Sequence, residues 1–155
     1  EDEESGSEAS MKRFFIDANI MLDALLQRVG HDSQEAIQLL AMGEKRRVRL
    51  LTTSNSMGVV LYQLQRSDAD KKGPRLRNAQ RIIIDLLACV EVVPLDAEHF
   101  RMSAASTFGD IEDGAQYFAV AGTGALDGVV SRDPDYDGHI GTKRLNAEQA
   151  LRALR

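Results

Sequence analysis

Short runs of apolar residues alternate along this chain with segments in which apolar residues recur at helical spacing. Four of these runs are predicted to be β-strands: Arg13–Asp17, Val48–Thr52, Val90–Pro94 and Gly128–Ser131. Helical segments separate the runs and hairpin signals are few, so βαβ crossovers are expected to connect the strands. The pattern therefore predicts an α/β fold with three layers (α/β/α), in which helices cover both faces of a short, mainly parallel central sheet.

Polar residues mark where the predicted helices begin. The helix that begins at Asp32 has Glu35 three residues later, in the position of a capping box. Either Thr53 or Ser54 is expected to cap the helix that follows the second strand. The other predicted N-caps are Asp96 and Asn146, and a further helix is expected from Asp110 to about Ala121.

Composition excludes several classes of protein. The 155 residues are 43% hydrophobic and 28% charged, which is ordinary for a globular protein and argues against wholesale disorder. The single cysteine, Cys89, cannot form an internal disulfide and is expected to pack among apolar residues. No apolar run approaches the roughly 20 residues of a membrane span, so a cytoplasmic protein with no membrane partner is expected. We expect residues 1–10 to be an acidic, flexible N-terminal tail and residues 11–155 to be a single domain.

Charge is distributed unevenly along the chain, although the formal net charge is only −5. Residues 44–81 contain ten basic and three acidic residues, whereas residues 82–155 contain six basic and twelve acidic ones. One surface is therefore expected to bind a polyanion and another to bind cations, although a basic run is also typical of a solvated helix face. The basic residues that could contact a nucleic-acid backbone are Lys45, Arg46, Arg47, Arg49, Lys71, Lys72, Arg75, Arg77 and Arg81.

Three acidic residues are expected to meet at one edge of the sheet. Asp17 ends the first predicted strand, Asp133 follows the last one, and Asp113 lies in the first turn of the helix that precedes it. Crowded carboxylates repel one another, and a divalent cation removes that penalty. Oxygen ligands select hard ions such as Mg²⁺ or Mn²⁺. Taken singly, each aspartate is more easily explained as a helix cap or turn residue, and the case for a site rests on their shared placement.

Three motifs in this sequence resemble the PIN-domain ribonucleases. The segment F-F-I-D-A-N-I-M-L-D (Phe14 to Asp23) is similar to the opening strand of that family and its D-x-N motif. The segment D-I-E-D-G-A-Q-Y-F-A-V-A (Asp110 to Ala121) is similar to a later helix of the family. V-V-S-R-D-P-D-Y (Val129 to Tyr136) resembles its last strand and the loop after it. The motifs occur in the order of the family, and the resemblance runs from Met11 nearly to the C-terminus.

The resemblance implies a site and a reaction. Asp17, Asp113 and Asp133 would be catalytic residues that bind Mg²⁺ or Mn²⁺. Glu112 would be a further ligand. The residues expected around them are Asn19, Ser131, Arg132, Asp110 and Asp135. The implied activity is endonucleolytic hydrolysis of single-stranded RNA, most plausibly by the toxin of a toxin–antitoxin pair. Its implied partners are RNA, a small antitoxin protein and, in a homodimer, a second copy of the chain.

One departure from the family pattern leaves an alternative open. Many members carry a glutamate on the helix after the second strand, but here the corresponding position falls at about Val59, with no acidic residue nearby. The alternative is a catalytically weak PIN-like module that binds RNA or protein. A phosphotransfer protein of the receiver or haloacid-dehalogenase type is disfavoured, because the first strand ends in Asp17-Ala18-Asn19 rather than in a pair of acids, and Lys143 lies in a poor context.

Overall fold

The computed structural model describes residues 11–28, 30–67 and 74–155; the side chains of residue 67 and of residues 74–77 are outside this description. The predicted tail, residues 1–10, also lies outside the described residues. No helix in the described ranges is long and apolar enough to cross a membrane. In chain order the elements are β1 (Arg13–Ile16), α2 (Ala18–Leu26), α3 (Ser33–Glu44), β2 (Arg49–Thr53), α4 (Ser54–Ser67), α5 (Pro74–Leu87), β3 (Glu91–Val93), α6 (Ala97–Ala104), α7 (Ile111–Ala121), β4 (Gly128–Val130), the 3₁₀ turn η1 (Pro134–Tyr136), β5 (Arg144–Leu145) and α8 (Ala147–Ala153).

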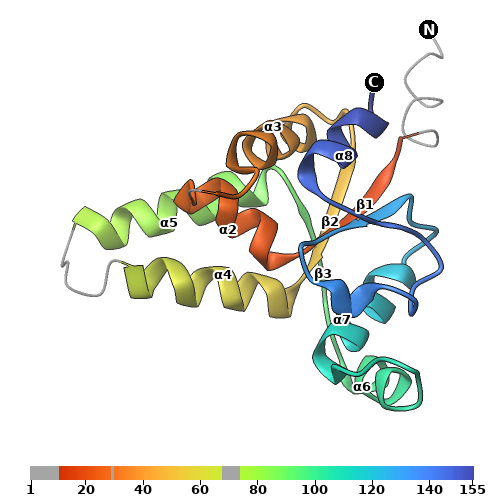
Figure 1. The fold of residues 1–155 in the computed structure, drawn as a ribbon. Coiled ribbons are helices and arrows are strands. Elements are labelled where there is room, and N and C mark those ends of the chain that lie inside the picture. The colour runs from red at the N-terminus through yellow and green to blue at the C-terminus, as the bar shows by residue number, and fades with distance from the viewer. Residues whose placement is uncertain (1–10, 29, 68–73) are drawn as a thin grey trace, which may run out of the picture.

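The described strands form one five-stranded sheet in the order β3-β2-β1-β4-β5, and every neighbouring pair is parallel. Helices cover both of its faces, which confirms the predicted three-layer α/β/α fold (Figure 1). The strand order reverses between β1 and β4, because the chain moves outward from β1 to β2 and β3 on one side and later returns to β4 on the other. In open parallel sheets such a reversal opens a crevice at the carboxyl ends of the two strands.

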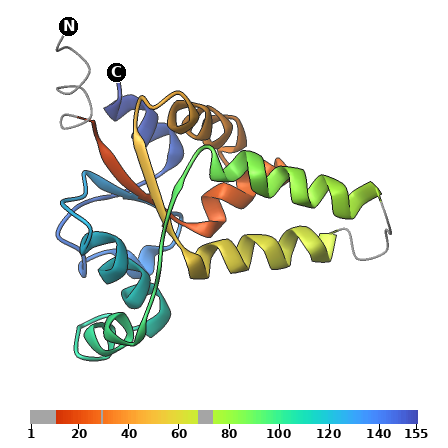
Figure 2. The ribbon, with the colours of Figure 1, turned by 180° about the vertical axis from the view of Figure 1, so that it is seen from behind.

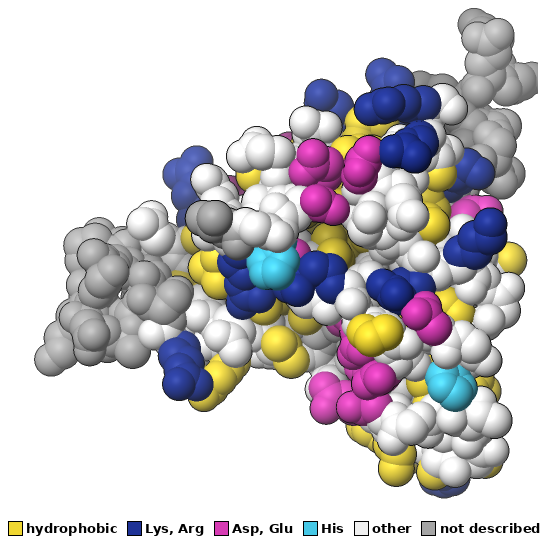
Figure 3. Space-filling model, in the orientation of Figure 1, with side chains coloured by type: hydrophobic (Ala, Val, Ile, Leu, Met, Phe, Trp, Pro, Cys, Tyr) yellow, Lys and Arg dark blue, Asp and Glu magenta, His cyan; other side chains and the backbone are white. Residues whose placement is uncertain are grey.

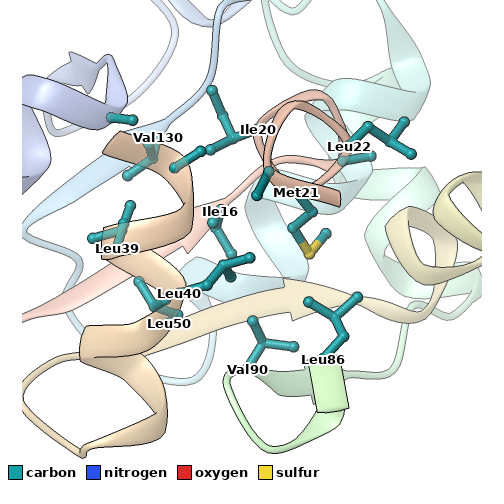
Figure 4. Close-up of a cluster of buried hydrophobic side chains, with 14 of the residues drawn as sticks. Ile16, Ile20, Met21, Leu22, Leu39, Leu40, Leu50, Leu86, Val90 and Val130 are labelled. Atoms are coloured by element: carbon teal, nitrogen blue, oxygen red, sulfur yellow. The ribbon is translucent and has the colours of Figure 1, made fainter. Parts of the chain in front are cut away.

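Both faces of the sheet are buried, as expected for parallel strands under two layers of helices. Alternate side chains of β1 enter different cores: Phe14 and Ile16 pack with α2, α3 and α8, whereas Phe15 packs with α7. Figure 4 shows the first of these cores, in which Ile16 of β1 lies among side chains of α2, α3 and β2. The alternation fixes the register of β1, because a slip of one residue would exchange the two cores.

Most of the predicted helix caps are present, and one is wrong in detail. The Thr53 Oγ1 accepts a hydrogen bond from the Ser56 amide (3.1 Å), and Asp96 and Asn146 cap their helices through their side chains, as Asp110 does for α7. Asp32 is the N-cap of α3, but its side chain makes no capping hydrogen bond. The expected capping box of Asp32 and Glu35 is therefore absent. The Ser33 hydroxyl ties the start of α3 to the preceding loop by donating to the Arg28 carbonyl oxygen (2.7 Å).

Helices α4 and α5 lie side by side and extend away from the sheet in both ribbon views (Figures 1 and 2). Their exposed side chains include several large apolar ones: Val59, Leu61, Tyr62, Ile84 and Leu87. Cys89, which follows α5, is half-buried against the first core, as expected.

The position of α7 depends on a close approach to α6. A Cβ atom on Gly114 would collide with the Ser103 hydroxyl and lie 2.9 Å from the Phe108 ring, so only glycine fits there. The Ser103 hydroxyl donates to the Ile111 carbonyl oxygen (2.7 Å), which ties α6 to the first turn of α7. This packing holds the acidic first turn of α7 near the carboxyl edge of the sheet.

Candidate metal centre

Strand pairing brings the first and last motifs of the chain together at the reversal point of the sheet. Ile16 of β1 pairs with Val130 of β4, and the Asp17 amide donates to the Val130 carbonyl oxygen (3.0 Å). Asp17 and Ser131, the residues that follow these strands, therefore lie side by side. The fold thus brings together residues that are 114 positions apart in sequence.

Asp17 is 8% exposed, and three donors hold its carboxylate in one orientation. Its Oδ1 accepts from the Ala18 amide (2.7 Å), and its Oδ2 accepts from the Ser131 hydroxyl (2.7 Å) and the Asn19 amide nitrogen (3.3 Å). Burial raises the pKa of Asp17, while the bonds from Ser131 and Ala18 act against that shift. Asn19 and Ser131 therefore orient Asp17, the role that the resemblance implied for Asn19.

Ser131 connects Asp17 to Asp133. Besides donating to Asp17, the fully buried Ser131 hydroxyl accepts a hydrogen bond from the Asp133 amide (3.0 Å). The Asp133 Oδ1 in turn accepts from the Asp135 amide (2.9 Å), which begins the turn η1. One hydroxyl therefore fixes both the side chain of Asp17 and the backbone at Asp133.

The first turn of α7 completes the acidic group. Asp110 caps this helix by accepting from the Asp113 amide (3.1 Å), and carboxylate oxygens of Asp110, Asp113 and Asp135 lie within 4.8 Å of one another. Burial, the charge of Asp110 and the interaction with Asp133 raise the pKa of Asp113 to about 8, and the charge of Asp17 adds to the shift. At neutral pH Asp113 therefore holds a proton unless a cation replaces it.

These acids fit a hard divalent cation. Every candidate ligand is a carboxylate oxygen, and the repulsion between these carboxylates favours the binding of a cation. The buried hydroxyl of Tyr136 has no hydrogen-bond partner among the described residues, and burial together with the charges of Asp17, Asp113 and Asp133 raises its pKa. A buried donor of this kind normally has a hydrogen-bond partner, so the Tyr136 hydroxyl is a polar group left over next to the carboxylates.

The predicted site residues differ in how closely their carboxylates approach one another. Asp17, Asp113 and Asp133 act on one another electrostatically, whereas the tightest set of oxygens joins Asp113 to Asp110 and Asp135. Glu112 lies outside that set, because its Oε1 accepts from the Asn55 side chain of α4 (2.8 Å). Asp110 and Asp135 are therefore better placed than Glu112 to be further ligands.

The Arg132 side chain pairs with a further acid, Asp23, rather than with the carboxylates of the acidic group. Its Nε and Nη2 donate to Asp23 at 2.8 and 3.1 Å, and Asp23 is 2% exposed. Sequence reasoning missed Asp23 as a functional candidate. The available signal was a charged residue on a helix, α2, whose other inward positions are apolar.

The basic residues expected to contact RNA are mostly not at this edge. Lys45, Arg46 and Arg47 lie between α3 and β2, so they are at the amino edge of the sheet, opposite the acids. Lys71 and Lys72 fall outside the described residues, and Arg75 lies in α5 with its side chain undescribed. Figure 3 shows acidic side chains gathered near the start of α7, with Lys and Arg side chains next to them on the same face.

Comparisons with known proteins agree with this architecture. A family model described as PIN domain matches residues 13–135. The crystal structure of PAE2754 from Pyrobaculum aerophilum is similar, with a TM-score of 0.61, 17% sequence identity, and coverage of 92% of this chain and 89% of that one. No curated protein matches. The matched segment includes all three acidic motifs, and the chain belongs to the PIN-domain family.

Proposed function

We propose that this chain is a metal-dependent endonuclease that hydrolyses phosphodiester bonds of single-stranded RNA with Mg²⁺ or Mn²⁺. PIN domains are generally metal-dependent nucleases. The observation that carries the proposal is the meeting of five carboxylates from three motifs at the reversal point of the sheet, where the pKa of Asp113 is raised to about 8. Although Asp110 and Asp133 also cap the elements that follow them, crowded carboxylates repel one another, and such crowding is typical of a cation site.

Each residue has a defined part in this proposal. Asp17, Asp113 and Asp133 hold the cation, with Asp110 and Asp135 beside them, while Ser131 and Asn19 keep the carboxylate of Asp17 in place. When bound, a divalent cation neutralises phosphate oxygens and lowers the pKa of a water molecule. Asp113 loses its proton when the cation binds, so uptake of metal is coupled to release of a proton.

The toxin role, an antitoxin partner and a homodimer stay predictions from the resemblance. The exposed apolar side chains of α4 and α5, among them Tyr62 and Ile84, are consistent with a protein partner. A test of the toxin role is co-purification of the full chain with a candidate antitoxin encoded next to its gene.

Cleavage of a labelled single-stranded RNA tests the proposed activity directly. We expect cleavage with Mn²⁺ and none with EDTA, because carboxylates alone cannot neutralise the phosphate. Glu148→Gln serves as the matched control, since Glu148 is an exposed acid on α8 that pairs with Arg152, and it should leave cleavage unchanged. Equal cleavage in EDTA would overturn the metal-dependent assignment.

One observation favours the alternative of a binding module. Helix α4 has no acidic residue between Ser54 and Ser67, and the half-exposed Val59 stands where many members have a glutamate. Binding of the same RNA without cleavage at any Mn²⁺ concentration would support this alternative.

A further inference from the structure

Two arginines meet at a single buried carboxylate next to the acidic group. Arg132 lies between Ser131 and Asp133, and it pairs with Asp23 through both Nε and Nη2. Arg28 follows the end of α2, and its Nη1 lies 3.9 Å from the same carboxylate. Asp23 is 2% exposed at its side chain, whereas both arginines are 34% exposed. The carboxylate is thus inside the protein and the two guanidinium groups reach the surface.

The backbone also holds both arginines in place. The Ser33 hydroxyl donates to the Arg28 carbonyl oxygen (2.7 Å), and Gln27 before it has a left-handed backbone (φ 47°) that turns the chain after α2. The Arg132 amide donates to the Asn19 side chain (3.4 Å). The second bond ties Arg132 to the segment that carries Asp17, whereas the first ties Arg28 to the start of α3. The positive charge of Arg132 acts against the burial that raises the pKa of Asp17.

The charges in this cluster do not cancel. One carboxylate faces two guanidinium groups, which leaves a net positive charge beside a group of acids. Asp23 occupies only the Nε and Nη2 edge of Arg132, and within the described ranges the Nη1 of Arg132 has no hydrogen-bond partner. A planar guanidinium with unused N–H groups is suited to phosphate oxygens.

We propose that Arg28 and Arg132, held side by side by the buried Asp23, form a phosphate-binding pair that contacts the RNA backbone next to the bond to be cleaved. This inference rests on the proposed nuclease function and names the residues that hold its substrate. Arg132 lies between Ser131 and Asp133 in the chain, and its amide donates to Asn19, so a strand bound by this pair would pass beside the acidic group. The Lys and Arg side chains next to the acids in Figure 3 lie on the face where such a strand would run.

RNA binding in EDTA tests the pair without any need for cleavage. Fluorescence anisotropy with a labelled 12-nucleotide oligouridine would compare the full-length wild type with Arg28→Gln and Arg132→Gln over a series of salt concentrations. Each change should weaken binding about fivefold and reduce the slope of log K against log salt by about 0.7, because each removes one phosphate contact. A 12-nucleotide oligoadenosine should lose the same factor, since phosphate contacts do not read bases.

Arg152→Gln is the matched control, because Arg152 is an exposed arginine of α8 whose partner, Glu148, lies 2.6 Å away on the same helix. It should change neither affinity nor slope. Arg28→Gln is the variant less prone to misfold, because the contact of Arg28 with Asp23 is long (3.9 Å) and its loss should cost little stability. Circular dichroism would confirm that both variants keep the native helix content.

The outcomes separate this inference from the proposed function. Unchanged affinity and slope in both folded variants, or no RNA binding by the wild type, would overturn the phosphate-binding pair, even if Mn²⁺-dependent cleavage persists. The expected loss of binding in a protein that never cleaves RNA would support the pair and contradict the nuclease function.

Discussion

Replacing Asp113 with asparagine should abolish metal-dependent cleavage and, at the same time, stabilise the metal-free protein at pH 8. Cleavage should fall at least about 100-fold, because the variant lacks a carboxylate at the centre of the acidic group. Stability should rise because the folded protein no longer has to hold a negative charge among other carboxylates. A residue with opposite effects on activity and stability is characteristic of a functional site.

The pH dependence follows from the pKa of Asp113. In the unfolded chain this carboxyl titrates near the ordinary value of 3.8, whereas in the folded metal-free protein it titrates near 8. Between these values the folded state binds the proton that the unfolded state has lost, so the free energy of unfolding falls as pH rises from about 4 to about 8. Asp113→Asn removes that contribution. At pH 8 we expect a gain of about 2 kcal/mol, reduced from the full shift because solvent partly screens a half-exposed group.

Urea denaturation in EDTA at pH 5 and pH 8 would measure this effect. The gain of Asp113→Asn over wild type should be larger at pH 8 than at pH 5. The exposed Asp127, at the opposite end of β4, provides Asp127→Asn as a control that should show no such gain. A variant that is less stable than wild type at pH 8 in EDTA would mean that Asp113 is not crowded in the metal-free protein.

Replacing Gln116 with leucine should destabilise the protein by about 2–4 kcal/mol. The Oε1 of Gln116 accepts from the Thr53 hydroxyl (2.6 Å) and from the Ser56 hydroxyl. All three side chains are at most 4% exposed, so leucine would leave two buried hydroxyl donors without an acceptor. These bonds join α7 to β2 and α4, and their loss should also displace Asp113 and weaken cleavage.

Thermal and urea denaturation would measure the loss in Gln116→Leu. The exposed Gln38 of α3 offers the matched change Gln38→Leu, which should alter the free energy of unfolding by less than about 0.5 kcal/mol. If the two substitutions had equal effects, the bonds between Gln116 and the two hydroxyls would not anchor α7.

The central architecture was predictable because it follows from local patterns. Apolar runs identified β1 to β4, and polar caps such as Asp96 and Asn146 identified helix starts. The strand β5 was not predicted, since its two residues, Arg144 and Leu145, have no periodicity to detect. Asp32 shows the limit of a capping rule, because it occupies the predicted N-cap position while its side chain forms no capping hydrogen bond.

Predicting the site required long-range geometry that a sequence gives only in part. Asp17 and Asp133 were identifiable, because residues after parallel strands share one edge of the sheet. The closeness of Asp135 to Asp110 depends on how the turn η1 meets α7, and no local pattern encodes it. Arg46 and Arg47 show that closeness in sequence does not place a residue at the site. They directly precede β2, which puts them at the amino edge of the sheet, opposite the acids.

Isothermal titration calorimetry with Mn²⁺ tests most directly whether these carboxylates form a cation site. The wild-type chain should bind Mn²⁺ at pH 7 with release of about one proton, and Asp17→Asn, which keeps the size of the side chain, should bind at least about tenfold more weakly. Absence of Mn²⁺ uptake by a folded wild-type protein, or equal uptake by Asp17→Asn, would contradict the account.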